Sequence, residues 1–132
     1  MNPQLWALAV AGILVLAAVA LEFVRSSRAR RLALAGAGPG TPATEPYILY
    51  FTGDGCTVCR THQEPALAKL ESVRVDRIDA VADRQLADRF QVYTLPTTVV
   101  MSSSGRALHV NYGYAPAPKL ARQLAEARTL TA

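Results

Sequence analysis

The longest apolar stretch of the chain lies near its start. Residues 5–24, LWALAVAGILVLAAVALEFV, contain a single charged side chain, Glu22. A helix of this length is about 30 Å long, which matches the hydrocarbon core of a bilayer. A buried helix of a globular domain is rarely so long and so uniformly apolar. The pattern therefore predicts one membrane-spanning helix over Leu5–Val24.

The charges that flank this stretch distinguish an anchor from a cleaved signal peptide. The residues AVA at 18–20 resemble a cleavage site, but a signal peptide carries its basic residues before the apolar run. Here MNPQ carries none, whereas four arginines come after the run: Arg25, Arg28, Arg30 and Arg31. We therefore expect residues 1–31 to form an uncleaved single-pass anchor with a basic flank. The positive-inside rule places the chain beyond the helix in the cytoplasm, and an extracytoplasmic domain is the alternative.

The same arginines account for the net charge of the chain, which is formally +4. Residues 45–132 hold ten Lys and Arg against nine Asp and Glu, so this part is close to neutral. The positive charge is concentrated where lipid headgroups would lie, and it does not indicate a nucleic-acid partner.

Beyond the anchor, residues 32–46, LALAGAGPGTPATEP, are rich in Ala, Gly and Pro and predict a flexible linker. The remaining 47–132 alternate between strand and helix patterns. Strands are expected over 47–52, 73–79, 97–102 and 107–112, and helices over 56–71, 83–90 and 115–128. The order β-α-β-α-β-β-α predicts an α/β domain, and its terminal hairpin makes the sheet mixed.

The chain has two cysteines, Cys56 and Cys59, in the stretch GDGCTVC. A Gly-rich break after the first strand puts Cys56 at a helix N-terminus, where the helix dipole favours the nucleophilic thiolate. Cys59 comes one turn later, close enough to attack a mixed disulfide on Cys56. The spacing predicts that Cys56 attacks and Cys59 resolves. Such chemistry needs no organic cofactor and no metal, because the cysteines carry the electrons.

Two other interpretations of the cysteines are open. They could be a structural pair inside a helix, or they could bind zinc with His62 and His109 as the other ligands. Structural zinc sites usually consist of two close pairs of ligands. Here the two histidines are 47 positions apart on different predicted elements, so the redox interpretation is favoured.

A strand, a CxxC, a helix and a distant VYTLPTTVV together resemble the thioredoxin family. In that family a cis-proline precedes the strand beside the dithiol, and Pro96 matches it. Gly105 and Gly113 match two glycines of the family's hairpin. The resemblance covers about residues 47–128 and implies a minimal thioredoxin-like fold. It also implies exchange with protein thiols and disulfides, electrons from a reductase or another dithiol partner, and substrate contacts by Thr94, Leu95 and Pro96.

The sequence departs from the family at several positions. The common WCGPC is GCTVC here, and Tyr50 stands where thioredoxins have a buried Asp. Pro65 comes six residues after the second cysteine instead of five, and the extra N-terminal strand and helix are missing. These departures keep a second function open, a membrane-tethered binding or assembly subunit with little catalysis. A third is an outward-facing domain that reduces apocytochrome or copper-site cysteines.

Overall fold

The computed structural model describes residues 2–34 and 43–131. The chain divides into two compact units, one up to Arg31 and the other from Leu32 onward. Of the linker expected at 32–46, residues 35–42 lie outside the described part.

The first unit contains most of a single helix, α1, over Pro3–Leu34. Its apolar side chains are exposed from Leu5 to Val24, and Pro3–Ala29 is long and apolar enough to cross a bilayer. The helix continues ten residues past Val24, where the prediction ended. Arg, Ala and Leu, which dominate this extension, are strong helix formers. Residues 32–34, at the start of the expected linker, form the last turn of this helix.

The second unit contains a four-stranded sheet in the order β2-β1-β3-β4. The strands are β1 over Tyr47–Thr52, β2 over Val75–Asp79, β3 over Thr97–Met101 and β4 over Ala107–Tyr112. β2 runs parallel to β1, whereas β3 is antiparallel to both β1 and β4. The predicted mixed sheet is confirmed.

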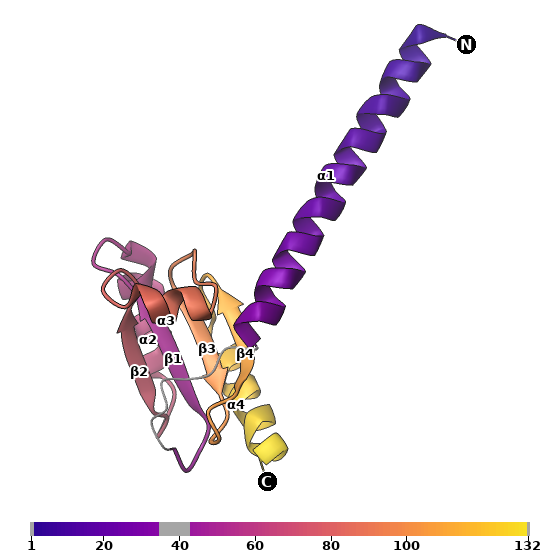
Figure 1. Cartoon of the computed structure of the whole chain (residues 1–132). Helices are drawn as coiled ribbons and strands as arrows, with labels where there is room; N and C mark the ends of the chain where they lie inside the picture. The colour runs from indigo at the N-terminus through magenta and orange to yellow at the C-terminus, as the bar shows by residue number, and fades with distance from the viewer. Residues whose placement is uncertain (1, 35–42, 132) are drawn as a thin grey trace. The chain divides into compact units, whose positions relative to one another are not determined.

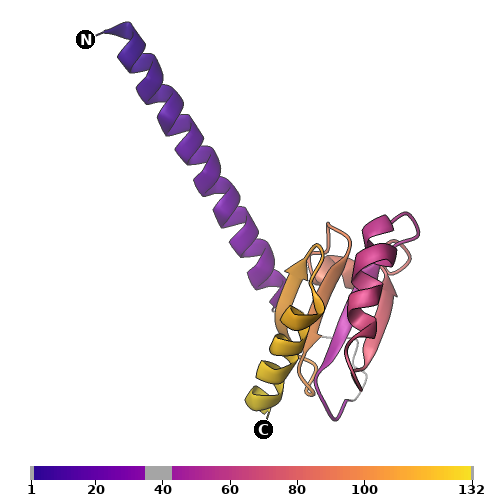
Figure 2. The same cartoon turned by 180° about the vertical axis from the view of Figure 1, so that it is seen from behind.

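Helices cover both faces of this sheet (Figures 1 and 2). α3, over Arg84–Arg89, lies on one face. α2, over Glu64–Ala68, and α4, over Ala117–Thr131, lie on the other. A π-helical segment, η1, over Cys59–Gln63, leads directly into α2. The predicted order of strands and helices is therefore confirmed.

The two faces form two apolar clusters, which alternate along β1 because successive side chains of a strand point to opposite sides. Tyr47, Leu49 and Phe51 pack with Leu86 and Ala87 of α3 and with Phe90, the residue that follows it. Ile48 and Tyr50 pack with Cys59, Leu67, Leu120, Leu124 and Ala127. Every residue of β1 is buried, as expected for a central strand covered on both sides.

Candidate active site

The two cysteines lie just beyond the C-terminal end of β1 and are joined by a disulfide. The connecting turn is closed by the Cys56 N–H, which donates to the Gly53 carbonyl over 3.1 Å. The Arg60 guanidinium donates to the Asp54 carbonyl over 2.7 Å and holds the turn against the helix. Helical backbone begins at Thr57, so Cys56 immediately precedes the first helical turn, as predicted.

The two sulfur-bearing residues differ in accessibility. Cys59 is 0% exposed and belongs to the cluster around Ile48 and Tyr50, whereas Cys56 is only partly buried. The backbone N–H of Cys59 points at the Cys56 sulfur over 3.2 Å. In the reduced protein this donor and the helix N-terminus would both stabilise a Cys56 thiolate. The arrangement thus has one partly exposed cysteine and one fully buried cysteine.

The segment Thr94–Pro96, called here the proline loop, lies beside this turn. The Leu95–Pro96 peptide bond is cis. Leu95 is partly buried against the cluster that contains Cys59. A Cβ atom placed on Gly53 would lie 3.1 Å from Leu95 Cδ1, so a glycine leaves room for this approach. The structure thus brings Leu95 next to the dithiol.

Hydrogen bonds at its C-terminal end fix the proline loop. The Thr97 hydroxyl donates to the Thr94 carbonyl over 2.6 Å, and the Gly113 N–H donates to the Pro96 carbonyl over 2.8 Å. Pro96 is buried, whereas Thr94 faces solvent. The loop is therefore held from β3 on one side and from the end of β4 on the other.

The π-helical segment explains the unusual spacing between Cys59 and Pro65. The Glu64 N–H donates to the Cys59 carbonyl, five residues back instead of four. Such a wide turn takes one more residue than an α-helical turn. Pro65, which cannot donate, then falls in the first turn of α2, where prolines are tolerated. The extra residue between Cys59 and Pro65 is thus absorbed by a widened turn that precedes the proline.

Gln63, at the end of η1, is a residue that the sequence analysis did not select. Its side chain is fully buried. Its Nε2 donates to the Ala115 carbonyl over 3.0 Å, and its Oε1 accepts from the Ala115 N–H over 2.9 Å. This pair of bonds ties the cysteine-bearing helix to the segment just after Gly113, which in turn holds Pro96. No local signal could reveal it, because the partner is 52 positions away.

Tyr50 lies on β1, six residues before Cys56, where the resemblance to thioredoxins would lead one to expect a buried carboxylate. It is 2% exposed, and its hydroxyl has no hydrogen-bond partner within the described part of the chain. Burial raises the pKa of the Tyr50 phenol above its usual value near 10. Tyr50 is therefore neutral at physiological pH, and a neutral phenol replaces the carboxylate.

The four zinc-ligand candidates are not brought together. His62 Nδ1 contacts the Thr61 hydroxyl over 2.7 Å, and His109 Nε2 lies 3.2 Å from Glu126 on α4. Residues 2–34 and 43–131 contain no group of three or more His, Cys, Asp or Glu placed to hold a metal ion. The cysteine pair thus stands apart from both histidines.

Four exposed apolar side chains lie at the same end of the sheet as the disulfide. They are Val58, Val81, Tyr93 and Tyr114, and together they are called here the apolar rim. Val81 and Tyr114 come just after β2 and β4, and Tyr93 precedes β3. β1, β2 and β4 end at the edge of the sheet where β3 begins, so all four residues lie at the same end as the cysteines. Exposed apolar groups gathered in this way are typical of protein-binding surfaces.

No family model matches the sequence, and no curated protein matches it. Solved structures do match. Thioredoxin-2 of a malaria parasite, described as a component of its protein secretion machinery, has 20% identity and a TM-score of 0.59, covering 69% of this chain and 94% of that protein. Fasciola hepatica thioredoxin has 23% identity and a TM-score of 0.53, with coverages of 64% and 82%. Oxidised mitochondrial thioredoxin 3 from Saccharomyces cerevisiae has 19% identity and a TM-score of 0.54, with coverages of 76% and 88%.

These likenesses confirm the predicted fold. The second unit is a thioredoxin-like α/β domain, and it carries a disulfide-forming Cys56–Cys59 pair where its first strand meets a helix.

Proposed function

We propose that this protein is a membrane-anchored thiol-disulfide oxidoreductase that exchanges its cysteine pair with protein substrates. The observation that carries the proposal is the asymmetric disulfide at the start of a helix, with Cys56 partly exposed and Cys59 fully buried. The thioredoxin-like fold supports the same chemistry, because this fold presents a CxxC pair in many redox proteins.

The exchange proceeds in two steps. The Cys56 thiolate attacks one sulfur of a partner disulfide, forming a mixed disulfide and releasing the partner's other sulfur as a thiolate. Cys59, after losing its proton, attacks the Cys56 sulfur, which releases the second partner thiolate and closes the Cys56–Cys59 disulfide. Two electrons pass from this protein to the partner, and the reverse sequence oxidises a partner dithiol. A reductase or another dithiol partner restores the starting state.

The proline loop and the apolar rim would hold the substrate. In this proposal an extended segment of the partner lies against Thr94, Leu95 and Pro96, and Leu95 shields the sulfurs from water. The rim around Cys56 offers apolar contacts to the surrounding surface of a protein partner. Small thiols would lack these contacts, so proteins should be the preferred substrates.

α1 would anchor the domain to the membrane with its basic end toward the cytoplasm. The helix is long and apolar enough to span a bilayer, and Arg25, Arg28 and Arg31 come after the apolar stretch. These charges favour a cytoplasmic domain by the positive-inside rule.

The redox function can be tested by trapping the mixed disulfide in cells. Cys59→Ser should accumulate covalent complexes with partner proteins that dithiothreitol releases, because the resolving thiol is gone. Cys56→Ser, with the same loss of one sulfur, should trap none. If both variants trap nothing and both keep the cellular role of the protein, the domain is a binding or assembly subunit instead.

The orientation can be tested with a cysteine-free chain in which both native cysteines are serine. Ser104→Cys, on the exposed β3–β4 turn, should react with a membrane-impermeant maleimide only after the cells are permeabilised. Asn2→Cys, at the other end of α1, should react in intact cells. The opposite pattern would place the domain outside and favour thiol chemistry on exported proteins.

A further inference from the structure

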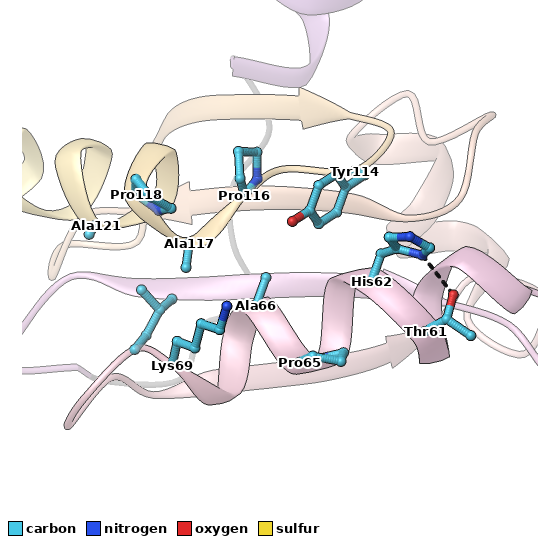
Figure 3. A pocket seen from close by; sticks show the side chains of 11 residues that line it. Thr61, His62, Pro65, Ala66, Lys69, Tyr114, Pro116, Ala117, Pro118 and Ala121 are labelled. Atoms are coloured by element: carbon cyan, nitrogen blue, oxygen red, sulfur yellow. Dashed lines mark hydrogen bonds between the residues drawn. The ribbon is translucent and has the colours of Figure 1, made fainter.

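We propose that a groove between α2 and α4 binds an extended acidic segment of the protein partner, beside the dithiol. The inference rests on the proposed function in so far as the partner is a protein. The groove has a volume of about 630 Å³ and is called here the α2–α4 groove. Figure 3 shows its two walls, one from the cysteine-bearing helix and one from the segment around the start of α4. Its lining includes Thr61, His62, Lys69, Tyr114, Pro116 and Ala121.

The position and the length of the groove suit a short extended segment of a partner polypeptide. Thr61 is two residues beyond Cys59, so the groove begins next to the active site. From Thr61 to Lys69 the helical wall is about 12 Å long, at a rise of about 1.5 Å per residue. An extended chain covers this distance with about four residues. A partner segment flanking the reactive cysteine could therefore enter it.

The walls are apolar and poor in backbone donors. Pro65, Pro116 and Pro118 contribute rings and no N–H groups, and Ala66 and Ala121 add methyl groups. Polar atoms of a partner segment can therefore be bound only by the few polar side chains in the lining. The partner must supply apolar side chains for the walls and must match those few polar groups.

Lys69 sets the charge of the groove. No acidic residue lines it, and Lys69 forms no ion pair within the part of the chain that the structure describes. The neighbouring Glu64 is paired with Arg77 of β2, outside the lining of the groove. Lys69 is exposed, so its ammonium would add a modest attraction for a carboxylate that lies in the groove. This positive charge favours a partner segment that contains Asp or Glu.

The end nearest the dithiol has a different hydrogen-bonding character. The Thr61 hydroxyl donates to the Thr57 carbonyl over 2.9 Å, so in its contact with His62 it accepts from Nδ1. In the tautomer that carries its proton on Nδ1, Nε2 can accept a hydrogen bond, such as one from a backbone N–H of an extended segment. The ring also packs edge-on against Tyr114, with centroids 5.8 Å apart. The groove thus offers an acceptor at one end and an ammonium at the other, which would orient the bound segment.

Binding can be measured without any redox reaction. The oxidised full-length protein in detergent micelles is titrated into a short fluorescent peptide of alternating leucine and glutamate that lacks cysteine, and anisotropy is recorded. A glutamine version of the peptide is the matched probe. The acidic peptide should bind about three- to five-fold more tightly at low salt, as an exposed ion pair permits, and the difference should shrink as salt is added.

Variants of the protein locate the site. Lys69→Gln should remove most of the preference for the acidic peptide. Arg106→Gln, which removes the same charge from the exposed β3–β4 turn, should leave it unchanged. Ala121→Glu should weaken the acidic peptide more than Ala121→Gln does, because the two side chains have similar size and only one repels a carboxylate.

Equal affinity for the two peptides, no binding of either, or equal effects of the Lys69 and Arg106 variants would overturn the proposal. These outcomes are separable from failure of the redox function. If Cys59→Ser traps no partner but the acidic peptide still binds through Lys69, the groove stands and the redox function fails. If partners are trapped but the peptide shows no dependence on Lys69, the redox function stands alone.

Discussion

Two segments border the disulfide, and they differ in how tightly their backbones are constrained. The proline loop is held by hydrogen bonds to Thr97 and Gly113, whereas η1 is a wide helical turn with one more residue than an α-helical turn. The loop leads directly into β3, whose residues pair with β1 and β4 from Thr97 onward. A residue inserted there would shift the pairing register of β3. Its apolar side chains would then point to the opposite face of the sheet. The helix has no such constraint, because a π-helical turn absorbs the extra residue.

The largest effect is expected where the two segments are coupled, at Gln63. Gln63→Leu should lower the free energy of unfolding by about 1–3 kcal/mol, because the N–H and carbonyl of Ala115 lose their buried partner. It should also slow formation of mixed disulfides at Cys56, since the helix and the proline loop are no longer tied together. Urea unfolding and single-turnover exchange measure the two effects.

The control for this change is Gln85→Leu, at an exposed position on α3. It should alter neither quantity. A Gln63→Leu protein that is less stable but exchanges at the unchanged rate would show that the two segments act independently.

A smaller effect is expected from the proline loop alone. Thr97→Val removes the hydroxyl that donates to the Thr94 carbonyl. Because Thr94 is exposed, water can replace part of this bond, so the loss of stability should be about 1 kcal/mol. The KM for a protein disulfide should rise while small-molecule exchange is unchanged. Thr97→Ser keeps the hydroxyl and should restore KM; if it does not, the hydrogen bond does not position the loop.

A change in stability of similar size but opposite sign, with no effect on exchange, is expected at Tyr50. Tyr50→Phe removes a buried hydroxyl without a described partner and should raise stability by about 1 kcal/mol. The exchange rate at neutral pH should not change, because the phenol is not a proton acceptor there. A marked loss of exchange would give Tyr50 a role in proton transfer.

The pH dependence provides a second check on Tyr50. Its pKa is raised by burial, so the unfolded chain loses this proton at lower pH than the folded chain. The contribution of Tyr50 to stability is complete below about pH 10 and falls as the pH rises further. Urea unfolding should show this alkaline loss in the native chain and less of it in Tyr50→Phe. Tyr93→Phe, at an exposed position, is the control.

Much of the fold could be predicted because β1, β3 and β4 are rich in aromatic and β-branched residues and end at glycines or serines. The cysteine pair was located for the same reason, by the glycine break before Cys56. The π-helical turn could not be predicted, because the apolar spacing of Cys59, Ala66 and Leu67 also fits an ordinary α-helix. Nor could the Gln63 bonds or the apolar rim, since both depend on segments that meet only after the chain has folded.

The complete burial of Cys59 has a practical consequence for the reduced protein. A thiol reagent too large to enter the core would count one sulfur per folded chain and two per unfolded chain. The number of labels per molecule would then report the folded fraction directly, including at the surface of a membrane, where optical signals from the lipid and from other proteins interfere.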